Sequence, residues 1–83
     1  MRRRTVGFTT NNLGLVQVID ALSNYKVGIF KKTILNVCTL VSEDGTKDYY
    51  IQATIRNNDL TCCMSELMEM NKKGTVINSL YVA

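Results

Sequence analysis

The sequence predicts an α+β fold of the ferredoxin-like class. In this fold the elements follow in the order β-α-β-β-α-β, and two helices cover one face of a four-stranded antiparallel sheet. Three observations support the prediction: four segments rich in alternating or β-branched residues, two intervening segments with apolar residues at helical spacing, and an Asp-Gly turn between the two middle strands. The chain has 83 residues and no linker-like stretch, which fits one domain with one core.

The first half of the chain predicts a strand, a turn and a helix. A strand is expected over residues 5–10, because Val6 and Phe8 alternate with threonine and glycine. The segment 11–14 breaks this alternation, and Asn12 is the expected N-cap of the helix that follows. The apolar face expected for this helix consists of Leu15, Val18, Ile19, Leu22 and Tyr25.

A β-hairpin is expected in the middle of the chain. Residues 33–42 are rich in Thr, Ile, Val and Leu and predict a long strand, and Asp44-Gly45 predicts the tight turn after it. The next strand, 49–56, alternates between two faces. One face holds Tyr49, Ile51, Ala53 and Ile55, and the other holds Tyr50, Gln52, Thr54 and Arg56.

A second helix and a last strand complete the pattern. The segment 57–59 offers helix caps, and the lysines and glycine of segment 72–74 favour a helix C-terminus. The apolar face of this helix is expected to hold Leu60, Cys63, Met64, Leu67 and Met68. The last strand is expected over residues 75–82, with Val76, Leu80 and Val82 on one face. The sheet face away from the helices is then expected to carry Tyr50, Thr54, Ile77 and Tyr81, and to be covered by water or a partner.

The net charge of +3 is concentrated at the N-terminus. Arg2, Arg3 and Arg4 supply all of it, because the remaining seven basic residues (ten minus three) balance seven acidic ones. We interpret residues 1–4 as a flexible basic terminus and residues 5–83 as the domain. The neutral domain argues against a broad nucleic-acid-binding surface.

The side chains offer little chemistry. The chain has three cysteines and no histidine, so we expect no disulfide framework, no metal site and no cofactor. No nucleophile motif, phosphate-binding loop or apolar carboxylate pair is present, and we therefore expect no enzymatic activity. No apolar run reaches the length of a membrane span, and we interpret the chain as cytoplasmic.

One turn suggests a family. The segment Asn11-Asn12-Leu13-Gly14-Leu15-Val16 resembles the start of the first helix in ACT domains, which are small-molecule-sensing modules of amino-acid metabolism. The family has an acidic residue or Asn, then Pro-Gly and two aliphatic residues; here Leu13 replaces the proline. The segments 25–29 and 72–77 are also similar to turns of that family, so that the resemblance covers about residues 5–82.

The resemblance implies a regulatory module that senses an amino acid or similar metabolite at this turn, across a homodimer interface. It also implies that residues around 29–33 of a partner help to close the site. The candidate ligand-binding residues are Asn11, Asn12, Leu13, Gly14, Leu15 and Ile29.

Elementary physical chemistry supports the same turn without the family. Gly14 permits the close approach of a ligand, and the free N–H groups at a helix start favour a carboxylate. If the turn has helical geometry, we expect a bulky residue such as valine in place of Gly14 to spare the fold, and if the site is real, to abolish ligand binding. A turn that does no more than cap a helix remains an alternative.

Two other functions stay open. An RNA-recognition motif has the same element order, but segment 47–54 lacks the glycine and aromatic spacing of the RNA-binding signature. A dimerisation domain without a ligand is the other alternative, and the missing proline at Leu13 favours it.

Overall fold

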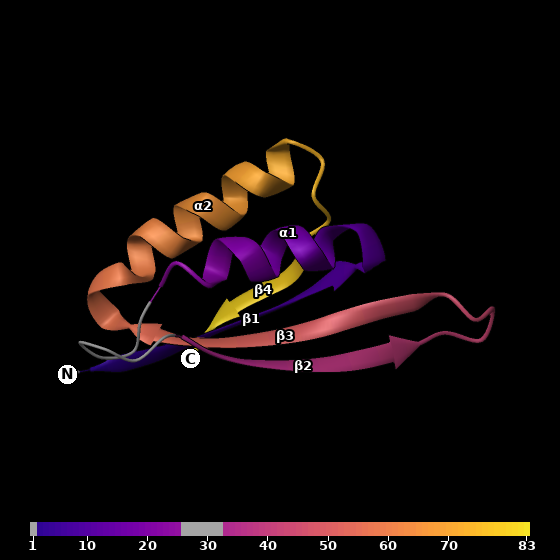
Figure 1. The fold of residues 1–83 in the computed structure, drawn as a ribbon, viewed down its shortest axis with the longest axis horizontal. Helices are drawn as coiled ribbons and strands as arrows, with labels where there is room; N and C mark the ends of the chain where they lie inside the picture. Colours follow the sequence, from indigo (N-terminus) through magenta and orange to yellow (C-terminus); the bar gives the residue numbers. More distant parts are fainter. Residues whose placement is uncertain (1, 26–32) are drawn as a thin grey trace.

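A computed structural model describes residues 2–25 and 33–83, and it shows the predicted ferredoxin-like fold. One antiparallel sheet has the strand order β2-β3-β1-β4, and both helices lie on the same side of it (Figure 1). The elements are β1 (Arg3–Asn11), α1 (Asn12–Leu22), β2 (Ile34–Val41), β3 (Lys47–Arg56), the short 3-10 helix η1 (Asn57–Asp59), α2 (Leu60–Lys72) and β4 (Asn78–Val82).

The first strand is longer than the sequence suggested. β1 begins at Arg3 rather than Thr5, and Arg3 and Arg4 pair with Arg56 and Ile55 of β3. The Arg4 guanidinium also donates to the carbonyl of Ala83 at 3.1 Å. Two of the arginines assigned to a flexible terminus are therefore part of the sheet.

The helix α1 starts with a side-chain cap. Asn11 has extended backbone angles, and its Oδ1 accepts a hydrogen bond from the Gly14 N–H at 2.9 Å. The cap predicted at Asn12 was wrong by one residue, since Asn12 is already the first residue of α1. Asparagine at either position could accept from the first turn, and the actual length of β1 decides between them.

Among the residues that the structure describes, the two glycines with positive φ are at the predicted turns. Gly45 has φ +84° in the hairpin, where Asp44 Oδ1 accepts hydrogen bonds from the Ser42 hydroxyl and the Thr46 N–H. Gly74 has φ +105° after α2, and the N–H groups of Gly74 and Thr75 bond to the last-turn carbonyls of α2. This second pattern is a Schellman motif, which ends α2 where the sequence predicted.

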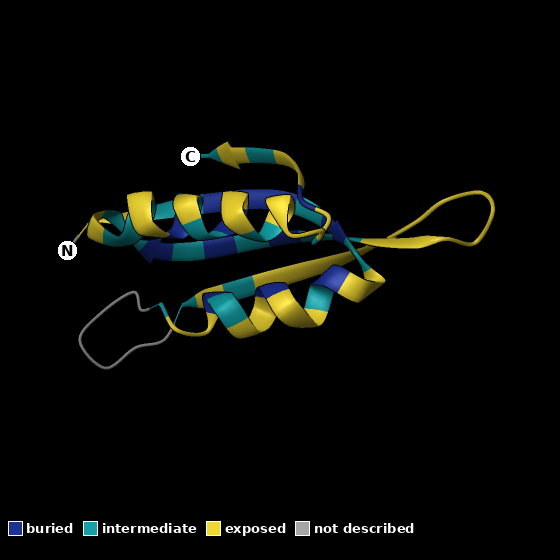
Figure 2. Ribbon diagram, turned by 90° about the horizontal axis from the view of Figure 1, so that it is seen from above, coloured by how far each residue is buried: buried dark blue, intermediate teal, exposed yellow. Residues whose placement is uncertain are grey.

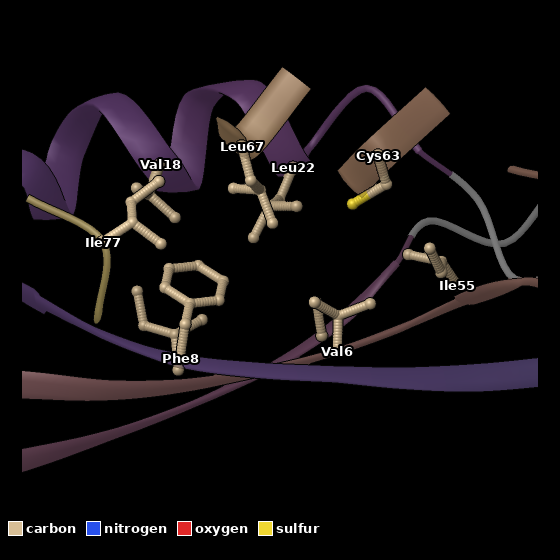
Figure 3. Close-up of a cluster of buried hydrophobic side chains, with 10 residues drawn as sticks. Val6, Phe8, Val18, Leu22, Ile55, Cys63, Leu67 and Ile77 are labelled. Atoms are coloured by element: carbon tan, nitrogen blue, oxygen red, sulfur yellow. The ribbon is translucent and has the colours of Figure 1, made fainter. Parts of the chain in front are cut away.

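The hydrophobic core lies between the sheet and the two helices (Figure 3). The buried apolar residues are Val6, Phe8, Val18, Leu22, Ile51, Ala53, Ile55, Cys63, Leu67 and Ile77. Most follow the predicted faces, but Met68 of α2 is 59% exposed, and Met70 packs partly against the core instead. The helical spacing alone predicted that Met68 is buried. It does not determine the rotation of α2 about its own axis, which decides whether Met68 or Met70 faces the core.

The last strand differs most from its prediction. β4 begins at Asn78, and its pairing with β1 shifts register between Gly7 and Thr9. Ser79 has a φ of 55°, which breaks the alternation expected for a regular strand. Ile77, expected on the outer face, is consequently buried in the core.

The sheet face away from the helices, called the open face here, carries the expected tyrosines. The Tyr81 side chain reaches from β4 across Gly7 of β1, and its hydroxyl bonds to that of Tyr50 on β3. Gln52 Nε2 donates to the same Tyr81 oxygen at 3.1 Å. This bonding lowers the pKa of Tyr81 and raises that of Tyr50, as expected when Tyr50 is the donor.

Candidate functional site

The fold brings three chain segments together at one end of the sheet, where β1 finishes and β3 and β4 begin. The end of β1 lies beside the start of β3, where Asn11 pairs with Asp48, and beside the start of β4, where Thr9 pairs with Asn78. The helix α1 starts and the helix α2 finishes at this same end of the sheet. The β1–α1 turn predicted as a site therefore has neighbours that are distant in sequence.

One hollow, the turn pocket, lies between the start of α1 and the link from α2 to β4. It has a volume of about 220 Å³. Its walls are formed by Asn11, Leu13, Gly14, Gln17, Lys73, Gly74 and Thr75. The Thr75 hydroxyl donates to Gln17 Oε1 at 2.6 Å, and this bond ties the two walls together.

A second hollow, the hairpin pocket, lies on the other side of the turn. It has a volume of about 470 Å³ and is more open. Its walls are formed by Asn11, Asn12, Leu13, Thr46, Lys47, Asp48 and Tyr49. The Tyr49 hydroxyl donates to Asn12 Oδ1 at 3.3 Å, so that Asn12 is oriented toward the hairpin. Asn11 and Leu13 line both hollows.

The turn pocket favours a negatively charged or polar group. The first N–H groups of a helix have no partner within the helix, and the positive end of the helix dipole lies there. No acidic side chain in the first turn of α1 offsets that charge. Lys73 adds an ammonium group whose only ion pair in the described residues, to Glu69, is long at 3.9 Å and exposed. A small carboxylate is the group that this setting attracts.

Gly14 is needed for packing as well as for the pocket. It is buried, and a Cβ at this position would collide with Thr10 Oγ1 and lie 3.2 Å from both Asn11 Oδ1 and Thr75 Cγ2. The expectation that valine at Gly14 would spare the fold was therefore wrong. Thr10 Oγ1 is itself buried and finds no hydrogen-bond partner in the described structure.

The structure separates the candidate residues into three groups. Asn11, Asn12, Leu13 and Gly14 line one or both hollows. Leu15 lines neither, because its side chain is half-buried against the core. Ile29 lies outside the described residues, and so does most of the segment 29–33.

Sequence reasoning missed the walls that come from elsewhere in the chain. Gln17, Lys73 and Thr75 complete the turn pocket, and residues 46–49 form a wall of the hairpin pocket. The predicted order of the elements was the signal that could have identified these residues. In a β-α-β-β-α-β fold the end of the first strand meets the starts of the third and fourth strands.

A polar cluster joins the far ends of the helices. Tyr25 donates to Glu66 Oε2 at 2.5 Å, and burial together with this bond raises the pKa of Tyr25. Cys62 Sγ lies 3.8 Å from the same hydroxyl. The cluster ties the segment after α1 to α2, and we interpret it as a structural contact.

No group of three or more metal-ligating side chains occurs in segments 2–25 and 33–83. Neither helix is long and apolar enough to cross a membrane. No protein-family model matches the chain, and no curated protein matches it by sequence.

Proposed function

We propose that this protein is a regulatory module that binds an amino acid or a similar small carboxylate in the turn pocket and works as a homodimer. The observation that carries the proposal is the pocket itself, a hollow of about 220 Å³ at the start of α1 with polar walls from two other parts of the chain. This volume is below the roughly 300–1,000 Å³ of drug-sized sites, and it suits a ligand of a few heavy atoms.

Each wall has a role in the proposed binding. The carboxylate of the ligand bonds to the N–H groups at the start of α1, with Lys73 as counter-charge. The amide of Gln17 and the side chain of Asn11 meet an amino group or hydroxyl, since both amides donate and accept. Leu13, which is 82% exposed, covers the apolar part of the ligand.

We further propose that the module has no catalytic activity of its own. The polar walls of the turn pocket consist of two amides, a hydroxyl and one lysine. None of these pairs a nucleophile with a base, as covalent or acid–base catalysis requires. Binding would act on whatever domain or partner the module contacts.

The test is a thermal-denaturation screen against the twenty amino acids and related carboxylates. A ligand at about one hundred times its dissociation constant stabilises the folded state by roughly 2.7 kcal/mol, which is several degrees for a domain of this size. A hit is then measured on Leu13→Trp, in which the larger side chain blocks both hollows from an exposed position. We expect this variant to fold and to lose the ligand-induced shift.

The matched control is Val16→Trp, which adds the same side chain to α1 at a residue that is 73% exposed and lines neither hollow. It should keep the full shift. A second pair of variants tests whether Lys73, which lines the pocket, contributes to binding. Lys73→Met should weaken binding about two- to fivefold, and Lys72→Met should leave it unchanged. An equal response of Leu13→Trp and Val16→Trp would place the ligand elsewhere.

Nucleic-acid binding is the second candidate, and one observation favours it. Tyr50 and Tyr81 lie together on the open face, with ring centroids 6.5 Å apart, where bases stack in RNA-recognition motifs. A short RNA belongs in the same screen. Stabilisation by RNA that weakens with salt and is lost in Tyr50→Ala would favour this function over metabolite binding.

A further inference from the structure

A group of arginines lies at the end of the sheet opposite the turn pocket. β1 begins there with Arg3 and Arg4, and β3 finishes there with Arg56. Figure 2 shows the N-terminus beside the start of α2, at the other end of the molecule from the tip of the β2–β3 hairpin. Since Arg2, Arg3 and Arg4 supply the whole net charge of +3, this is the basic end of an otherwise neutral domain.

Two of these arginines are directly opposed in the sheet. Arg3 of β1 pairs with Arg56 of β3, and the register places both on the open face. Arg4 belongs to the other face, where its guanidinium donates to Asn57 Oδ1 and to the Ala83 carbonyl. Opposed residues of an antiparallel pair have Cα atoms only about 4.5–5.5 Å apart, and like charges in this position destabilise a sheet. The pair is therefore unfavourable for folding alone.

The cation of Arg3 is not neutralised within the described part of the chain. All seven acidic residues of the sequence lie in segments 2–25 and 33–83, and none of them forms an ion pair with Arg3. Arg3 is also exposed. An anion from solution can thus reach it without displacing a protein partner.

Asp59 orients the second arginine. The Arg56 Nε–H donates to Asp59 Oδ2 at 2.8 Å. Asp59 is the residue before α2, yet its side chain makes no capping bond to the helix and holds the arginine instead. Among the described residues, the two terminal nitrogens of Arg56 have no protein acceptor. Their N–H groups remain available to the oxygens of a ligand.

We propose that Arg3 and Arg56 bind a phosphate group at this end of the open face. A phosphate group offers three oxygens and up to two negative charges, so it can accept from two guanidinium groups at once and relieve their repulsion. A carboxylate has two oxygens, which a single guanidinium already occupies. The positive end of the α2 dipole lies at the same end of the molecule and adds to the attraction.

The rest of the open face distinguishes two sources of the phosphate. Thr5 and Thr54, the next opposed pair on this face, add hydroxyl groups. Tyr81 lies over Gly7, four residues along β1 from Arg3, or about 13 Å at the rise of a strand. A small phosphorylated molecule would reach the arginines and threonines, whereas a single-stranded nucleic acid would also reach the tyrosine. The site is remote from the turn pocket and does not rest on the proposed function.

A titration of the whole chain with inorganic phosphate, followed by NMR at constant ionic strength, tests the site. The Arg56 Nε–H signal and the Thr5 amide should shift, with a dissociation constant on the order of 1 mM for two exposed cations. Arg3→Gln should weaken binding at least about fivefold. Lys72→Gln removes the same charge at the far end of α2, and it should change binding by less than about twofold.

Two further variants separate the proposed role of Arg3 from a structural one. Without phosphate and at low salt, Arg3→Gln should be at least as stable to heat as the parent, because the repulsion with Arg56 is gone. A structural arginine would give a lower midpoint, and that result would contradict the proposal. Arg3→Lys keeps the charge and loses the planar fork, so that it should bind phosphate better than Arg3→Gln and less well than the parent.

Uridine monophosphate and an oligouridylate of about eight nucleotides identify the source of the phosphate. Tighter binding of the oligonucleotide, lost in both Arg3→Gln and Tyr50→Ala, would assign the phosphate to a nucleic acid. Equal binding of the monophosphate and inorganic phosphate, independent of Tyr50, would assign it to a small molecule.

The proposal fails if Arg3→Gln titrates like the parent, if the shifts fall on Gly14 and Thr75 of the turn pocket, or if none of the three probes binds. Leu13→Trp, which blocks the turn pocket, should keep the phosphate response. Arg3→Gln should in turn keep any stabilisation by an amino acid. Failure of the phosphate site and failure of the turn pocket are therefore read separately.

Discussion

The phenol ring of Tyr81 lies directly over Gly7, so that β1 has no room for a side chain at this point. The ring spans three strands, since it starts on β4, covers β1 and bonds to Tyr50 on β3. A glycine in the middle of a strand weakens it, and an aromatic ring from a neighbouring strand compensates by covering the exposed backbone.

A double-mutant cycle tests this contact. Gly7→Ala should lower the free energy of unfolding by about 1–3 kcal/mol, because the new methyl group displaces the ring. The same change in a Tyr81→Ala background should cost much less, since the clash is gone. Urea denaturation of the parent, the two single variants and the double variant measures the coupling, and purely additive effects would contradict the contact.

Thr10 offers a stabilising substitution. Its hydroxyl is buried and finds no partner in the described structure, and a buried hydroxyl without a hydrogen bond costs roughly 1–3 kcal/mol. Thr10→Val keeps the shape and removes the hydroxyl, so we expect the free energy of unfolding to rise by about 1 kcal/mol. Thr10→Ser is the control: it keeps the hydroxyl, loses a methyl group, and should be less stable than the parent.

The three cysteines should react differently with a thiol reagent. Cys38 and Cys62 are exposed, whereas Cys63 is buried. Burial, and to a smaller extent the charge of Glu66, raises the pKa of Cys63 from 9.0 to about 11. At about pH 8 we expect two thiols to react quickly in the folded protein and the third only after unfolding. Fast labelling of all three would show that α2 is not packed as described.

Because the pKa of the Cys63 thiol is raised, we expect the stability of the folded protein to decrease at alkaline pH. Since the folded pKa of Cys63 is the higher one, its contribution is fully present below pH 9 and is lost as the pH rises toward 11. The thermal midpoint of the parent should therefore fall over this range. Cys63→Ala should show a shallower fall, although it is less stable at neutral pH.

At the hairpin turn, Asp44 should make the stability fall as the pH is lowered, whereas Cys63 makes it fall as the pH is raised. Hydrogen bonds from Ser42 and Thr46 lower the pKa of Asp44 from 3.8 to about 2. The charged carboxylate stabilises the turn above the unfolded pKa, and this contribution is lost as the pH falls from about 4 to about 2. Asp44→Ala should be less stable than the parent at neutral pH, and the difference should shrink in this window. A difference that does not change with pH would contradict the role of the charge.

The sequence predicted the elements that depend on local chemistry. The Asp44-Gly45 hairpin and the end of α2 at Gly74 each follow from a backbone position that glycine adopts easily, and both were found where expected. The pattern of the core strands also held, because Val6 and Phe8 alternate cleanly between two faces.

The errors arise where tertiary contacts decide. Ile77 is buried because Ser79 interrupts β4, and nothing in the spacing of residues 75–82 signals that interruption. Met68 is exposed because the roll of α2 on the sheet depends on all its contacts. The turn residues of the site were identified locally, whereas Gln17, Lys73 and Thr75 became neighbours only through the fold.

Leu13 separates the two hollows beside the β1–α1 turn, and this position governs the size of the space available there. Its side chain reaches into solvent with little packing to hold it, so evolution could shorten or lengthen it at almost no cost in stability. A shorter residue would merge the turn pocket and the hairpin pocket into one trough, and a larger one would close both. Selectivity for small or large ligands could thus change through a single substitution, while the rest of the domain stays as it is.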